Sequence, residues 1–176
     1  DAFQTSSQQI DLTKVAIIVA GDGPMREEIA DKLKTLAPHV YLLGRISPEN
    51  VPALLMNCDL HVTTSEKETR GLTILEAFAA GIPVIAPCSG GVVENIDDGN
   101  NGFLYTPGDR YNFTSKLKLL IENSALRKQM GERAKISVQG YSWDRSIQNL
   151  VNIWQEEIER KQMINEQQLL VNPEYN

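Results

Sequence analysis

The sequence has little cysteine, and what it has forms no recognisable framework. Cys58 and Cys88 are the two cysteines in 176 residues, and their spacing is not that of a zinc site. A disulfide-stabilised scaffold needs a far higher cysteine density, so that class is excluded. We therefore expect two free thiols in a reducing cytosol.

Long apolar runs and an excess of basic residues are also missing. No stretch approaches the roughly 20 continuous apolar residues that span a bilayer, and no signal peptide opens the chain. The net charge of −6 argues against non-specific binding to nucleic acid. With 41% apolar and 23% charged residues, the composition is that of a globular domain. The first residue is Asp1 and not Met, so we expect a cytoplasmic globular fragment of a longer protein.

Two familiar nucleotide-binding motifs are absent. The turn Gly21-Asp22-Gly23-Pro24 follows an apolar run, but Arg26 stands where the dinucleotide-binding fingerprint needs its third glycine. No P-loop pattern occurs either. The glycine pattern at 21–24 therefore predicts a tight turn, with direct contact to a ligand left open.

What the chain does have is an alternation of short apolar runs and helical patterns. This alternation predicts an α/β fold with a doubly wound, Rossmann-like parallel sheet. We expect residues 1–14 to be a linker remnant, 15–160 the domain and 161–176 a loose polar tail. An apolar stripe from Trp143 to Ile158 predicts core packing by the last helix. The expected strands are 15–20, 40–43, 60–63, 83–86 and 103–105, and the expected helices are 25–37, 51–56, 71–80, 113–122, 125–138 and one that begins after Ser142.

Ligands of such sheets bind beyond the carboxyl ends of the strands, which directs attention to the loop that ends at Gly71. A helix that begins there points free N–H groups and a positive dipole end at the crevice, and both suit a diphosphate. Glu68 precedes the helix and Glu76 lies inside it. Carboxylates repel phosphates but accept hydrogen bonds from vicinal hydroxyls, so one acid suits a ribose and the other a sugar. The pattern indicates a nucleotide sugar.

At this point the sequence resembles a known family, the group 1 retaining glycosyltransferases. The spacing of Glu68 and Glu76, with Gly71-Leu72 between them, resembles the donor-binding motif of that family. The resemblance implies one half of a GT-B architecture, namely its C-terminal, donor-binding domain. Further ordered matches are Gly21-Asp22-Gly23-Pro24, the loop Leu43-Gly44-Arg45-Ile46, Gly90-Gly91 with Glu94, and Asp98-Gly99 with Gly102.

The resemblance also implies a role for each matching residue. It assigns the transferred sugar to Glu68, as the catalytic candidate, and the ribose hydroxyls to Glu76. Phosphates and sugar would face the backbone of Gly71, Leu72 and Thr73. The base would lie near Arg45 and Ile46, and Gly21 would leave room for the nucleotide.

The implied reaction moves a sugar from a UDP-, GDP- or ADP-sugar to an acceptor hydroxyl with retention, without a cofactor or a metal. The implied partner is an acceptor-binding N-terminal domain of the same protein. Peripheral contact with the inner face of the membrane stays open, since many relatives act on lipid-linked acceptors. The chain departs from the family at Arg70, where an aromatic residue is usual, and it lacks the upstream Arg and Lys that neutralise the diphosphate.

Two alternatives remain open from the sequence. A sugar-nucleotide epimerase of GT-B architecture shares the fold and the nucleotide crevice. A non-catalytic nucleotide-binding or regulatory module would use the same fold without turnover.

Overall fold

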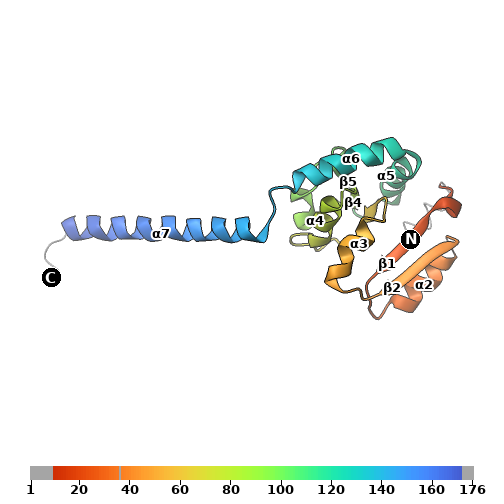
Figure 1. Cartoon of the computed structure of the whole chain (residues 1–176), viewed down its shortest axis with the longest axis horizontal. Helices are drawn as coiled ribbons and strands as arrows, with labels where there is room; N and C mark the ends of the chain where they lie inside the picture. The colour runs from red at the N-terminus through yellow and green to blue at the C-terminus, as the bar shows by residue number, and fades with distance from the viewer. Residues whose placement is uncertain (1–9, 36, 172–176) are drawn as a thin grey trace. The chain divides into compact units, whose positions relative to one another are not determined.

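A computed structural model describes residues 10–35 and 37–171 of the chain. The chain divides into two compact units, residues 1–138 and 139–176. In the first unit, strands and helices alternate as the apolar pattern predicts (Figure 1). Its elements are the short 3-10 helix η1 (Leu12–Lys14), β1 (Ala16–Ala20), α2 (Arg26–Lys34), β2 (His39–Gly44), η2 (Pro48–Asn50), α3 (Val51–Leu55), β3 (His61–Val62), α4 (Leu72–Ala79), β4 (Val84–Pro87), η3 (Gly90–Glu94), β5 (Gly102–Tyr105), α5 (Arg110–Glu122) and α6 (Ser124–Ser137).

All strand pairs are parallel, which confirms the α/β class with parallel sheets. The strands form two sheets in place of one: β1 pairs with β2, and a second sheet has the order β3-β4-β5. In the first sheet Ile18 lies opposite Tyr41, and in the second His61 lies opposite Val84. Every strand therefore points its carboxyl end toward the same edge of its own sheet, where the loops that carry the candidate residues begin.

The core of the first unit is centred on β4, whose four residues are all buried. The sequence Val84-Ile85-Ala86-Pro87 has no polar side chain, as expected for a strand covered on both faces. Helix α4 packs Ile74, Ala77 and Phe78 into the same core, and each of these is fully buried. This packing fixes α4 relative to β4 and so fixes the start of α4, which is the candidate phosphate site.

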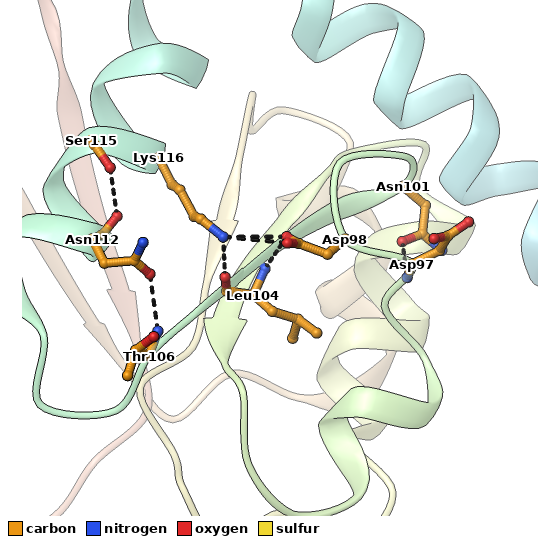
Figure 2. Close-up of polar contacts among 8 residues, drawn as sticks. All are labelled: Asp97, Asp98, Asn101, Leu104, Thr106, Asn112, Ser115 and Lys116. Carbon is orange, nitrogen blue, oxygen red and sulfur yellow. Dashed lines mark hydrogen bonds and ion pairs between the residues drawn. The ribbon is translucent and has the colours of Figure 1, made fainter.

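Strand β5 is the outer strand of the second sheet, and side chains satisfy its free edge (Figure 2). Figure 2 shows the Asp98 carboxylate accepting a hydrogen bond from the Leu104 amide, at 2.8 Å. The Lys116 ammonium lies 3.4 Å from Asp98 and also donates to the Leu104 carbonyl oxygen. An unpaired strand edge invites pairing with another chain, and these side chains protect it. The motif Asp98-Gly99 with Gly102 therefore has a structural role in this fold.

In the described part of the second unit, residues 139–171, there is one long helix, α7 (Trp143–Val171). Ser142 caps it as predicted, because its hydroxyl accepts a hydrogen bond from the Arg145 amide at 3.2 Å. The helix continues through 161–171, where the sequence analysis expects a loose polar tail. The predicted core packing of the stripe is not observed within this unit, where a lone helix leaves Ile147 and Trp154 exposed.

No helix in the described ranges has both the length and the apolarity needed to cross a bilayer.

Candidate functional site

The start of α4 is shaped by Gly71, which precedes the helix with φ of +62°. This left-handed conformation suits glycine, and a Cβ at Gly71 would lie 2.9 Å from the Ile74 side chain. Gly71 has no side chain with which to cap the helix, so no side chain of the N-cap residue occupies the free N–H groups of the first turn. The position and geometry of Gly71 match an anion-binding helix start.

One face of α4 carries three of the predicted donor-binding residues. Leu72, Thr73 and Glu76 are all exposed, on the side of the helix away from the core. Leu72 is 62% exposed although it is apolar, so this leucine is not held by the core. The periodicity that buries Ile74, Ala77 and Phe78 leaves the other three residues together on the solvent face.

Glu68 lies half-buried in the loop 64–70, which joins β3 to α4. Three carbonyl oxygens of this loop accept hydrogen bonds from the segment Ser89–Asn95. The Ser89 hydroxyl donates to the Glu66 carbonyl at 2.5 Å, the Gly91 amide to the Glu68 carbonyl at 2.9 Å, and the Asn95 side-chain amide to the Arg70 carbonyl at 2.7 Å. Every second carbonyl is held, so the backbone that carries Glu68 is fixed.

Gly91 permits this contact because glycine has no side chain, and the space at this position would not hold one. A Cβ at Gly91 would lie 1.8 Å from the Thr69 carbonyl oxygen. In the sequence, the Gly90-Gly91 motif is a match to a family pattern and no more. In the structure, it lets η3 lie directly against the loop that carries Glu68. Its neighbour Glu94 is exposed.

A second group of predicted residues lies at the carboxyl ends of β1 and β2. The Gly21 amide donates to the Gly44 carbonyl at 2.7 Å, which brings the two loops together. Arg45 is exposed and Ile46 is half-buried just beyond Gly44. The same edge borders a recess of about 320 Å³ between the sheet and the start of α2, lined by Val19, Gly21, Asp22, Gly23, Pro24, Met25, Arg26, Ile29 and Leu42.

The predicted residues thus fall into two groups on two sheets. The structure brings Glu68, Gly71, Leu72, Thr73 and Glu76 together on one loop and one helix. Gly21, Arg45 and Ile46 form the other group, and β1 and β3 are not paired in the described ranges. The individual roles in donor binding and catalysis stay predictions.

Sequence reasoning missed Ser89 and Asn95, which hold the Glu68 loop. The side chain of Asn95 and its acceptor at Arg70 are 25 positions apart in the sequence. No local pattern signals a side-chain bond to a backbone carbonyl over that distance. The one local signal for an unusual conformation in this segment is the adjacent glycine pair Gly90-Gly91.

Burial shifts the pKa values of His61 and Tyr105, which lie in the sheet of β3, β4 and β5. Burial lowers the pKa of His61, and the His61 Nε2 atom is the one buried side-chain polar atom without a hydrogen-bond partner in 10–35 and 37–171. The pKa of Tyr105 is raised, first by burial and then by the nearby charge of Glu66. A buried histidine side chain is usually hydrogen-bonded, and the Nε2 atom of His61 is an exception to that rule.

The chain matches the family "Glycosyl transferases group 1" over residues 1–137. It is 34% identical over 135 residues to sulfoquinovosyl transferase SQD2 of Arabidopsis thaliana, covering 75% of this chain and 26% of the relative. It is 35% identical over 140 residues to N-acetyl-alpha-D-glucosaminyl L-malate synthase of Bacillus anthracis, covering 78% and 36%.

Among solved structures, the chain is similar to Anabaena HepE in complex with UDP-glucose. The TM-score is 0.76 and the identity 27%, over 88% of this chain and 44% of HepE. The chain therefore spans only about a quarter to under half of the proteins that it resembles. The match over residues 1–137, the parallel α/β fold and the solved relative agree, and the chain belongs to the group 1 glycosyltransferase family as a domain of the C-terminal type.

Proposed function

We propose that this chain binds a nucleoside diphosphate sugar and that the whole protein transfers the sugar, with retention, to an acceptor hydroxyl. The observation that carries the proposal is the exposed face of α4, where Leu72, Thr73 and Glu76 follow the glycine turn at Gly71. The similarity to a protein crystallised with UDP-glucose supports a donor of the same class.

The diphosphate would lie at the start of α4. The N–H groups of the first turn and the positive end of the helix dipole favour an anion there. Charge develops on the diphosphate as the bond to the sugar breaks, and donors that are already oriented stabilise it without reorganisation. The proposal assigns this task to the chain's own N–H groups around Gly71 and invokes no cofactor.

The two carboxylates would hold the hydroxyl groups on either side of the diphosphate. Glu76 projects from the exposed face of α4, one turn into the helix, and we assign it to the ribose. Glu68 lies in the fixed loop before the helix, and we assign it to the transferred sugar. A carboxylate accepts two hydrogen bonds from a vicinal diol, which gives each residue a specific partner.

The base would lie near Arg45 and Ile46, at the carboxyl end of β2. Gly21, joined to Gly44 by a hydrogen bond, leaves space beside this loop. The acceptor groups would come from the part of the protein outside this chain, so the isolated chain binds donor without efficient transfer. Closure of the two parts would exclude water from the reaction.

Glu76→Ala tests the proposal most simply. We expect the affinity of the chain for UDP-glucose, or for the GDP- or ADP-sugar that it prefers, to fall about tenfold or more, as lost hydrogen bonds to a charged acceptor do. The midpoint of thermal unfolding stays close to that of the wild type because the side chain is exposed.

Glu122→Ala is the matched control, since Glu122 is also exposed at a helical position, at the end of α5. The control should bind as the wild type does. Equal affinity of the wild type and Glu76→Ala would remove Glu76 from the site.

A further inference from the structure

We propose that Asn95 is a positioning residue for the donor site: its side-chain amide fixes the turn at Gly71, and with it the start of α4. This inference rests on the proposed function, since it concerns how the same site is held. Asn95 follows η3, and its side-chain amide donates a hydrogen bond to the Arg70 carbonyl oxygen.

The geometry places Asn95 directly on the turn. Its Nδ2 atom donates to the Arg70 carbonyl oxygen at 2.7 Å, one residue before Gly71. The same Nδ2 atom would lie 3.4 Å from a Cβ at Gly71, so the amide packs on the open side of the glycine. The carbonyl of Arg70 sets the orientation of the peptide that leads into Gly71. Fixing it therefore fixes where the first N–H groups of α4 point.

Asn95 is itself held by Asn101, which is buried with 4% of its surface exposed. The Asn101 Nδ2 atom donates to the Asn95 carbonyl oxygen at 3.2 Å. The Asn101 Oδ1 atom accepts from the Asp97 amide at 2.9 Å, the bond drawn in Figure 2. A buried amide with both ends bonded is costly to move, so it anchors the segment 95–101.

The anchor reaches α6. The Asn101 Nδ2 atom also lies 3.5 Å from the Ser137 hydroxyl, which in turn donates to the Ala134 carbonyl at 2.7 Å. Ala134 is fully buried in the core that α6 shares with α4. The turn at Gly71 is thus tied to the core twice, through α4 itself and through the side chains of Asn95 and Asn101.

A purely local role for Asn95 does not explain this arrangement. Ser89 and Gly91 already hold the loop at the Glu66 and Glu68 carbonyls. Asn95 adds a third bond at the last carbonyl before the helix, where an error in orientation would be transmitted to the diphosphate. We therefore expect its loss to affect groups bound at the helix start more than groups bound elsewhere.

The test compares Asn95→Ala with Asn57→Ala in the chain of 176 residues. Asn57 also donates from its side-chain amide to a backbone carbonyl, that of Ala53 in α3, at 2.8 Å. Two probes are titrated: UDP-glucose, which carries the diphosphate and the sugar, and uridine, which carries neither. Amide hydrogen exchange is followed at Gly91, Ile74 and Leu75, whose N–H groups are bonded to Glu68 and Gly71 carbonyls.

We expect Asn95→Ala to weaken UDP-glucose binding about tenfold, which corresponds to one hydrogen bond of about 1.4 kcal/mol. Its uridine affinity should stay within twofold of wild type, and exchange should accelerate at Ile74, Leu75 and Gly91. Asn57→Ala should change none of these. A merely structural role would lower both affinities together, or neither, and that result would overturn the proposal.

The two proposals fail in different ways. If the wild type binds neither probe at millimolar concentration, the proposed function fails for this donor, and exchange alone decides the role of Asn95. Faster exchange at Ile74 and Leu75 in Asn95→Ala then supports its hold on the turn. Unchanged exchange overturns the positioning role, whatever binds.

Discussion

The sheet of β3, β4 and β5 and the sheet of β1 and β2 carry the two groups of candidate residues, and they are packed differently. Strand β4 is buried along its whole length, between fully buried side chains of α4 and the packing of α5 and α6. In β1 and β2, by contrast, Gly44 is the only buried residue. Ile18 and Tyr41, which pair across these strands, are 38% and 53% exposed.

This difference indicates how far each half of the site is organised by the chain itself. The loop with Glu68 and the helix with Glu76 are held by core packing and by side-chain bonds from Ser89 and Asn95. The loops with Gly21 and Arg45 are joined to each other by the Gly21–Gly44 bond, and both are exposed. We therefore expect the proposed diphosphate and sugar subsites to be more rigid than the base subsite.

The largest expected effect separates the two sheets by stability. Phe78 is fully buried against β4, and Phe78→Ala should lower the free energy of unfolding by about 3–5 kcal/mol. Tyr41→Ala, on the exposed face of β2, should cost about 1 kcal/mol or less. Urea denaturation of the two variants measures both values. Equal losses would contradict the view that the second sheet holds the core.

Gly91→Ala comes next, because it acts on the contact between η3 and the Glu68 loop. Its new methyl group would meet the Thr69 carbonyl at 1.8 Å, so the loop or η3 must move. Overpacking of this kind costs about 1–3 kcal/mol, and we expect donor binding to be lost with it.

Gly23→Ala is the control for this substitution. A Cβ at Gly23 meets no atom within 4 Å, and the residue belongs to the β1 loop. Thermal unfolding and calorimetric titration with UDP-glucose compare the two variants. Wild-type binding by Gly91→Ala would show that the close approach is not needed for the site.

Asp98→Ala tests the protected edge of β5 and should have a smaller effect. It removes the acceptor of the Leu104 amide and the partner of Lys116, and we expect a loss of about 1 kcal/mol. Asp97→Ala is the matched control, because the neighbouring Asp97 carboxylate accepts its hydrogen bond from the exposed Asn100 side chain, at 2.9 Å. Chemical denaturation measures both. If Asp98→Ala is as stable as Asp97→Ala, the Asp98 side chain does not stabilise the edge of β5.

The smallest expected effect concerns His61 in β3. Burial lowers its pKa from the ordinary value of 6.5, so the unfolded chain binds a proton more readily than the folded chain. The stability that the neutral His61 side chain gives the fold is fully present above pH 6.5, and it is lost as the pH falls toward the lowered pKa. Stability should therefore decline below pH 6.5 in the wild type, and His61→Val should decline less steeply.

A variant His61→Val with the wild-type slope between pH 6.5 and 5 would contradict this assignment. The decline would then come from other groups, and the unpartnered Nε2 would have no consequence for stability.

The fold could be predicted from sequence because its signals are local. The apolar run at 83–86 and the helical spacing of Ile74, Ala77 and Phe78 each depend on neighbouring residues alone. The helix start at Gly71 and the cap at Ser142 are signals of the same kind. The division into two sheets was not predictable, since strand pairing joins residues far apart in the chain and apolar runs do not specify their partners.

The candidate site could likewise be predicted from sequence only where its signals are local. Glu68 and Glu76 stand out by spacing around a glycine, and the structure brings them onto one loop and one helix. The hold of Asn95 on Arg70 was not predictable, because a side-chain bond across 25 positions leaves no pattern in a single sequence. For the same reason the fixed orientation of the Glu68 loop could only be seen in three dimensions.

Calorimetric titration of the wild-type chain with UDP-, GDP- and ADP-glucose, beside the free nucleotides, tests the central claim most directly. The account predicts that one base is selected and that its sugar conjugate binds the wild type about tenfold or more tightly than it binds Glu76→Ala. Absence of binding by every one of these ligands at millimolar concentration would contradict the assignment of a donor site to this chain.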